Sequence, residues 1–373
     1  MTRTKQCASV RRVVVKVGTS TLTHATGEMN LIRLESLVRE LADMKNQGMD
    51  VILVTSGAVG AGIGKLGGKI PSTMPEKQAM AAIGQGALLH MYEKFFAEYG
   101  KTVGQILLTK DDLADRRRHL NARHTLFALL QYGAIPIINE NDTVTVDEIK
   151  FGDNDTLAAL VATLVDADLL VLLSDIEGLY TENPKENPDA TLIKEVREID
   201  EGIFSLAGGK GSNLASGGMQ TKIGAARIAT QAGIPMVIAN GEHIGILRRI
   251  LNGEECGTFF RANDLKVKNR KCWLAWSAQS KGVIMVDEGA YHAIYKSGKS
   301  LLSIGIVSVQ GKFEVGSVVS LRNHLGMEFA KGIVNYSSED LEKIKGKRTY
   351  EIKNILGEKD YDAVVHRDNL SLN

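Results

Sequence analysis

Two lysines stand beside glycine turns at places where a phosphate group could bind. Lys16 lies in the β-branched run 13–17 and is soon followed by Gly18, and Lys222 lies one turn after the glycine pair 217–218. A lysine in an apolar strand is costly unless an anion accompanies it. Glycine turns let backbone N–H groups approach phosphate oxygens, and a helix N-terminus favours a bound anion. Together the lysines predict a phosphate site, although Lys16 alone would also fit an edge strand that faces water.

Carboxylates and amides gather in two clusters, 139–142 and 152–155. The first cluster directly follows an apolar run, and the second leads into an apolar helix whose N-terminus Asn154 or Asp155 can cap. Amides together with carboxylates fit the recognition of an ammonium group and a carboxylate, as in an amino acid. Taken alone, however, the same residues fit a solvated acidic loop equally well.

Common nucleotide-binding motifs do not explain the glycines. Residues 62–67 match GxGxxG, but they begin six residues after the preceding strand and lack the acidic partner about 20 positions further on. A Rossmann oxidoreductase is therefore rejected, and we interpret 62–67 as a mobile glycine-rich loop. The sequence also lacks a GxxxxGK[ST] motif and protein-kinase signatures, so a phosphotransferase here would be neither a P-loop enzyme nor a protein kinase.

Alternating strands and helices position these residues. The hydrophobic pattern predicts strands at 13–17, 51–54, 106–108, 135–138, 169–173 and 235–238, and helices at 31–44, 75–99, 112–131, 156–165 and 218–232. Near-continuous apolar strands alternating with amphipathic helices indicate a three-layer αβα sandwich with a mainly parallel sheet. Ligands bind such sheets at the carboxyl ends of the strands. Small or polar residues follow four of these strands, as a site requires.

The pattern changes near residue 265. From there, short β-like segments punctuated by glycine replace the long helices. We therefore predict two domains, an α/β domain at 1–268 and a small, mainly β domain at 269–373. A chain of 373 residues is also long for a single core.

The overall composition excludes several classes of protein. The net charge of +1 argues against a chain built around nucleic acid or an anionic membrane. Three scattered cysteines, Cys7, Cys256 and Cys272, form no metal-binding pattern and fit a reducing compartment. We see no signal peptide and no apolar run near the roughly 20 residues that span a bilayer. We therefore expect a cytoplasmic protein without membrane partners.

Seven motifs taken together resemble the glutamate kinase family of the amino acid kinase superfamily. They occur in that family's order and spacing, and the resemblance extends over nearly the whole chain. The segments 286–290 and 363–368 resemble the PUA domain fused to many of these kinases. The seven motifs are KVGTS at 16–20, VTSGA at 54–58, LNAR at 120–123, INEND at 138–142, GDND at 152–155, GLYT at 178–181 and GGMQTK at 217–222.

The resemblance implies ATP-dependent phosphorylation of the L-glutamate γ-carboxylate to L-glutamate 5-phosphate, the first step of proline biosynthesis. In that reaction Lys16 and Lys222 would hold the transferring phosphoryl group, and Asp155 would orient both lysines. The glutamate would be held by Ser56, Asp142 and Asn154.

The resemblance also implies a nucleotide site. Mg²⁺ would bridge the ATP phosphates, with no dedicated protein metal site. The residues expected to bind ATP are Lys16, Ser174, Asp175, Ser216, Gly217, Gly218, Met219, Gln220, Thr221 and Lys222.

The same resemblance implies partners beyond ATP and glutamate. Free proline would act as a feedback inhibitor, the chain would form a homo-oligomer, and the product would pass to the next reductase of the pathway. Aspartate or N-acetylglutamate as the phosphoryl acceptor remains an alternative. RNA binding by the tail is a second one, but 15 basic and 12 acidic residues from Arg270 onward give too weak a charge for a strong RNA footprint.

Overall fold

The chain forms two compact units in the computed structural model. The first comprises Met1–Asp112 with Arg117–Lys266, and the second comprises Leu113–Arg116 with Val267–Asn373. The predicted domain boundary between 268 and 269 lies outside the described residues and stays a prediction. The structure describes residues 3, 7, 9–24, 28–68, 70–144, 154–184, 186–206, 217–262, 279–357 and 361–372.

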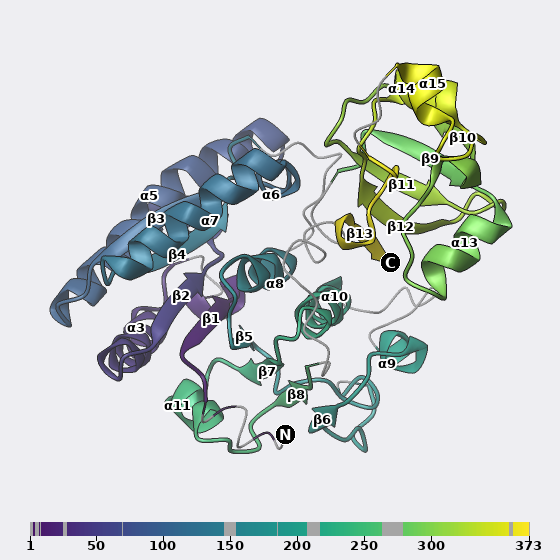
Figure 1. The fold of residues 1–373 in the computed structure, drawn as a ribbon. Helices are drawn as coiled ribbons and strands as arrows, with labels where there is room; N and C mark the ends of the chain where they lie inside the picture. Colours follow the sequence, from purple (N-terminus) through teal and green to yellow (C-terminus); the bar gives the residue numbers. More distant parts are fainter. Residues whose placement is uncertain are drawn as a thin grey trace. The chain divides into compact units, whose positions relative to one another are not determined.

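An eight-stranded sheet organises the first unit, in the order β3-β4-β2-β1-β5-β7-β8-β6 (Figure 1). Neighbouring strands are parallel except for the β7–β8 pair, which is antiparallel. The predicted mainly parallel sheet is therefore confirmed. Its strands are β1 (Arg12–Val17), β2 (Asp50–Val54), β3 (Val103–Leu108), β4 (Ile135–Glu140), β5 (Leu169–Ser174), β6 (Glu195–Val196), β7 (Met236–Asn240) and β8 (Thr258–Phe260).

Helices cover both faces of this sheet, which completes the predicted three layers. One face packs against α3, α5 and α11 in a single hydrophobic core. The other face carries α8 and α10, which lie side by side (Figure 1), and α7, which packs against β3 where Leu129 meets Gly104. These helices are α3 (Leu31–Asn46), α5 (Met74–Glu98), α7 (Arg116–Gln131), α8 (Asn154–Leu164), α10 (Gly217–Gln231) and α11 (Ile246–Leu251).

The central strand β1 places Lys16 in the middle of the sheet. It pairs with β2 on one side and β5 on the other, so that Lys16 lies between Val54 and Leu172. Successive side chains of a strand point to opposite faces. Val15 and Val17 join the α3 core, and Lys16 points to the α8 face. This position excludes the alternative of a solvated edge strand.

One sequence interpretation was wrong. Residues 62–67 do not form a mobile loop, because Ala58–Lys65 is the helix α4. Its glycines permit close helix packing rather than mobility. A Cβ on Gly62 would lie 2.8 Å from the carbonyl carbon of Met80, and a Cβ on Gly84 in α5 would lie 2.8 Å from that of Ala58.

Several short elements escaped the hydrophobic pattern. The single helix predicted at 112–131 is two helices, α6 (Lys110–Ala114) and α7. The strands β6 and β8 were not predicted, nor were the short helices α2 (Thr19–Leu22) and α9 (Glu201–Leu206). Elements of two to six residues carry too few positions for a clear periodicity.

The second unit is mainly β, as predicted. Its five-stranded sheet has the order β10-β9-β11-β12-β13, and its core is its own. Within the described residues, no helix of either unit is long and apolar enough to cross a membrane. The second unit contains β9 (Gly282–Val286), α13 (Glu288–Tyr295), β10 (Ile306–Gln310), β11 (Val318–Arg322), β12 (Glu328–Ile333), α14 (Ser338–Ile344), α15 (Ile352–Leu356) and β13 (Leu370–Leu372).

Candidate active site

A buried aspartate holds two lysines at the carboxyl end of the sheet. The Nζ atom of Lys16 lies 2.6 Å from Oδ1 of Asp155, and the Nζ atom of Lys222 lies 3.1 Å from Oδ2. Asp155 is completely buried, and both lysines are nearly so. The Lys16–Asp155–Lys222 cluster carries two positive charges against one negative charge. Its surplus charge suits a phosphate, and removing Asp155 would take away the carboxylate that pairs with both buried lysines.

The first turn of α10 extends this cluster. The hydroxyl of Thr221 lies 3.2 Å from Oδ2 of Asp155 and 2.9 Å from the carbonyl of Gly218, and its single proton can bond either acceptor. Lys222 also donates to Gly218, at 3.2 Å. Gly217, Met219 and Gln220 lie in the same turn, and Ser216 lies outside the described residues. The predicted nucleotide segment from 217 to 222 therefore begins a 15-residue helix whose N-terminal dipole favours an anion.

Asn154, the residue before Asp155, joins the ends of two neighbouring strands, β2 and β4. Its Nδ2, with two N–H groups, lies within hydrogen-bond distance of three acceptors: the carbonyl of Thr55 at 2.9 Å, Oγ of Ser56 at 2.7 Å and Oδ1 of Asn139 at 3.1 Å. Its Oδ1 is buried and has no hydrogen-bond partner within the described part of the chain. Buried acceptors are normally paired, so this oxygen fits a ligand that donates a hydrogen bond.

Two side chains of α5 support this network from behind. Gln85 accepts a hydrogen bond from Asn139 at 2.7 Å, and the hydroxyl of Tyr92 lies 2.8 Å from Oγ1 of Thr55. Oγ1 of Thr55 also lies 3.2 Å from the carbonyl of Ser56, and when Thr55 gives its single proton to that carbonyl, Tyr92 donates to Thr55. Complete burial raises the pKa of Tyr92 far above its ordinary value, with a smaller opposing effect from Thr55, so the phenol stays protonated.

Sequence reasoning missed Gln85 and Tyr92. The one signal that could have found them is their spacing of seven residues. This spacing places two side chains that can form hydrogen bonds on the same face of the helix.

Asp142 lies in a pocket of about 290 Å³ between α5, β3 and the segment after β4. Gln85 and Gln105 line the same pocket. Asp142 therefore lies in the same pocket as Gln85, which accepts a hydrogen bond from Asn139 in the Asn154 network. Burial raises the pKa of Asp142 above its ordinary value. A carboxylate in this position gains from a cationic partner, such as the ammonium group of an amino acid.

Ser174 and Asp175 end β5, directly beside β1. The hydroxyl of Ser174 donates to Oδ1 of Asp175 at 3.1 Å, and the carbonyl of Ser174 accepts from the N–H of Gly241 at 2.8 Å. The following residues are also tied down, because Glu177 accepts a hydrogen bond from Asn240 at 2.8 Å. All described candidate residues therefore lie at one edge of the sheet.

Comparisons with known proteins agree with this architecture. The amino acid kinase family model matches residues 11–240, and the PUA domain model matches residues 282–356. The chain is 57% identical to the glutamate 5-kinase of Moorella thermoacetica, with 97% of this chain and 96% of that protein aligned. It is 56% identical to the glutamate 5-kinase of Carboxydothermus hydrogenoformans, with 98% of each protein aligned. The chain belongs to the glutamate 5-kinase family.

Membership of the glutamate 5-kinase family confirms the resemblance read from the seven motifs. A solved structure supports the fold independently. The UMP kinase of Ureaplasma parvum is similar with a TM-score of 0.50 and 12% identity, over 68% of this chain and 99% of that one. Such low identity bears on the fold alone.

Proposed function

We propose that this chain transfers the γ-phosphoryl group of ATP to the γ-carboxylate of L-glutamate, giving L-glutamate 5-phosphate in the first step of proline biosynthesis. The Lys16–Asp155–Lys222 cluster, in a chain 57% identical to a glutamate 5-kinase, carries the proposal. One buried carboxylate fixes two ammonium groups at the strand edge where parallel sheets bind ligands.

The chemistry needs charge neutralisation rather than a base. The acceptor carboxylate has an ordinary pKa near 4.3, so it is already ionised at neutral pH. The obstacle is the approach of two anions, and lysines aimed at the developing charge lower that barrier. We assign Lys16 and Lys222 to the transferring phosphoryl group, and Asp155 to holding their ammonium groups in place.

We assign glutamate to the Asn154 network. Ser56 and Asn154 offer a hydroxyl and an unsatisfied amide oxygen beside the cluster, and Asp142 offers a carboxylate for the substrate's ammonium group. The substrate's γ-carboxylate would then face the lysines. This arrangement requires a free α-amino group, so N-acetylglutamate should be a poor acceptor.

We assign ATP to Ser174, Asp175 and the segment from 216 to 222. The positive end of the α10 dipole and Lys222 favour its phosphates. Mg²⁺ would enter with the nucleotide as MgATP, because magnesium in phosphotransferases is bound largely by substrate phosphates. Within the described residues, no group of three or more His, Cys, Asp or Glu side chains could hold a metal ion.

Family resemblance supports further proposals. Free proline should compete with glutamate, because both carry an α-amino acid head, and the chain should assemble as a homo-oligomer in the cytoplasm. The product should pass to the reductase that follows in the pathway. We also propose that 1–268 holds the whole active site and that 269–373 is a separate PUA domain without strong RNA affinity.

Substrate choice tests the function. With MgATP, L-glutamate should support ADP release far better than L-aspartate or N-acetylglutamate, measured with a coupled assay. Equal rates with aspartate would remove the assignment of glutamate as the acceptor.

Substitution of the lysines tests the mechanism. Lys16→Ala and Lys222→Ala should each lower kcat by roughly 10²–10³, the usual cost of losing one group that stabilises transition-state charge. Lys65→Ala is the matched control, since Lys65 is an exposed lysine in the glycine-rich helix α4. A wild-type kcat in either cluster variant would show that its lysine does not act in catalysis.

A further inference from the structure

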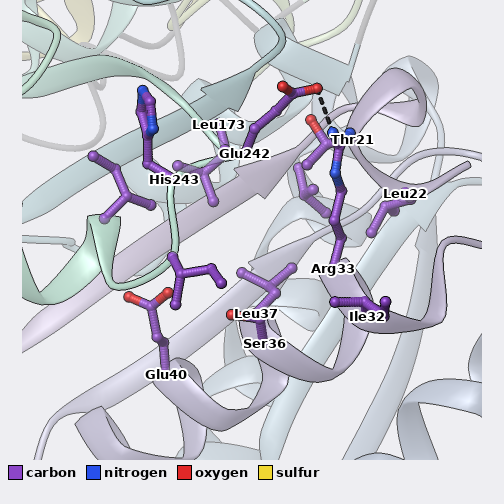
Figure 2. A pocket seen from close by; sticks show the side chains of 14 residues that line it. Thr21, Leu22, Ile32, Arg33, Ser36, Leu37, Glu40, Leu173, Glu242 and His243 are labelled. Atoms are coloured by element: carbon purple, nitrogen blue, oxygen red, sulfur yellow. Dashed lines mark ion pairs between the residues drawn. The ribbon is translucent and has the colours of Figure 1, made fainter.

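A second pocket lies on the α3 face of the sheet (Figure 2). It has a volume of about 170 Å³ and is lined from α2, α3, the end of β5 and the segment before α11. Val17 lines this pocket, whereas Lys16, its neighbour in β1, contacts Asp155 on the opposite face. The sheet therefore separates this α3-side pocket from the Lys16–Asp155–Lys222 cluster.

The α3-side pocket contains a buried hydroxyl with no protein partner. Thr21 in α2 is 4% exposed, and its Oγ1 has no hydrogen bond to any described residue. Figure 2 shows Thr21 among the side chains that line the pocket. Because an unpaired buried hydroxyl is costly, the site favours a ligand with a polar group that reaches this oxygen.

Among the charged side chains that line the pocket, the two carboxylates of Glu40 and Glu242 outnumber the one cation, Arg33. Arg33 pairs with Glu242 at 2.6 Å, the ion pair dashed in Figure 2. Glu40 lies across the pocket and accepts backbone N–H groups at the start of α11, from Gly245 and Leu247, both at 3.0 Å. Those amides carry only partial charge, so Glu40 is not neutralised. His243, at the rim, is instead 2.9 Å from Glu177. The net negative charge of these side chains favours a cationic ligand.

The walls of the pocket are aliphatic. Leu22, Leu37 and Ile246 are buried beneath it, while Ile32 and Ile244 are 77% and 80% exposed beside its polar groups. Drug-sized ligands occupy pockets of about 300–1,000 Å³, so a pocket this small requires a compact occupant. An aliphatic body with one polar end matches both the walls and the hydroxyl.

We propose that the α3-side pocket is a binding site for a small aliphatic ammonium ion. The ammonium group donates to the hydroxyl of Thr21, and the alkyl chain packs on Leu22, Leu37 and Ile246. Glu242 stays paired with Arg33, and Glu40 across the pocket supplies the negative charge that balances the ammonium group.

The occupant also borders two segments assigned to ATP. Thr21 follows the glycine turn after Lys16, and Leu173 directly precedes Ser174. Gly241 connects them, because its N–H donates to Ser174 and a Cβ on it would lie 3.0 Å from Cγ2 of Thr21. Occupancy of the α3-side pocket should therefore change the KM for ATP. This effect rests on the proposed function, whereas binding of the ammonium ion does not.

Calorimetric titration of the full chain with butylammonium chloride, at constant ionic strength, tests the proposal. We expect saturable binding that butyrate and 1-butanol, the anionic and neutral analogues, do not reproduce. Thr21→Val, which keeps the side-chain shape, and Glu242→Gln, which removes a partly exposed charge, should each weaken binding roughly threefold to tenfold. Glu93→Gln, on an exposed acid of α5, should leave it unchanged.

Asp142→Asn distinguishes this site from the glutamate site, because we assign the ammonium group of glutamate to Asp142. Binding that persists in Asp142→Asn supports the α3-side pocket even if the proposed function fails. Absence of saturable binding, equal binding of butyrate, or unchanged affinity in either folded pocket variant would overturn the proposal. Circular dichroism of each variant establishes that it is folded.

Discussion

Replacing Gly84 by alanine should disrupt the site without touching any candidate site residue. Its Cβ would lie 2.8 Å from the carbonyl carbon of Ala58, and closer still to the oxygen, so α4 and α5 must move apart by roughly 1.5 Å to restore ordinary contact. Overpacking typically costs about 1–3 kcal/mol, and the obstructing atoms here belong to a backbone that cannot rotate away. After a gain of about 1 kcal/mol in helix propensity, we expect a net loss of roughly 2 kcal/mol.

Catalysis should suffer along with stability. Ala58 begins α4 immediately after the Ser56–Gly57 turn, so a displaced α4 moves the hydroxyl of Ser56. A misplacement near 1 Å can cost about 10²-fold in rate, and kcat/KM for glutamate should fall by that order.

Gly86→Ala is the matched control for this prediction. Gly86 lies two residues along the same helix, is exposed, and would meet nothing within 4 Å of an added Cβ. It should gain up to about 1 kcal/mol of stability, and because Gly86 lines the pocket of Asp142 it serves as a control for stability alone. Urea denaturation and steady-state kinetics of both variants provide the measurement. Equal stability of the two variants would refute the close-packing argument.

Four further predictions follow from the site. Tyr92→Phe should raise the KM for glutamate roughly threefold to tenfold, because it removes a neutral hydrogen bond behind Ser56, and an equal rise in the KM for ATP would contradict this role. Asn154→Ala should act mainly on the KM for glutamate, so a fall in kcat alone would count against a binding contact. Burial raises the folded-state pKa of Asp142, so the ionised form of its carboxyl group disfavours folding once the pH rises through that pKa. Asp142→Asn should therefore stabilise the chain at neutral pH, measured by denaturation, while weakening glutamate binding. A chain that ends near residue 268 should stay folded and retain glutamate-dependent transfer, and a folded but inactive product would show that the site extends further.

The strand-and-helix alternation was predictable because the buried parallel strands are long apolar runs. Lys16 stood out for the same reason, as a charge within such a run. The rule that ligands gather at the carboxyl ends of parallel strands then brought Ser56, Asp142 and Ser174 to one edge without further information.

The long-range contacts were not predictable in the same way. No neighbouring residue in the sequence distinguishes Gly62, which lies where two helices cross, from a glycine in a loop. What requires a glycine there is the backbone of Met80, which is 18 positions further along the chain. Tyr92 likewise resembles an ordinary core aromatic until Thr55 is placed opposite it. The antiparallel strand β8 is three residues long, too short for periodicity to reveal.

Because Asn154 and Asp155 are adjacent in the chain, the distance between the two sets of contacts that they make is fixed. One residue contacts the segments assigned to the amino acid, and the next holds the lysines assigned to the phosphoryl group, so about 3.8 Å of covalent backbone separates the two anchors. Both belong to the first turn of α8. Every residue in the rest of that helix, from Leu157 to Leu164, is buried. Loop motion elsewhere cannot stretch this spacing. An acceptor shorter by one methylene should fail to satisfy both ends at once, so we expect the enzyme to discriminate acids by the length of their carbon chain.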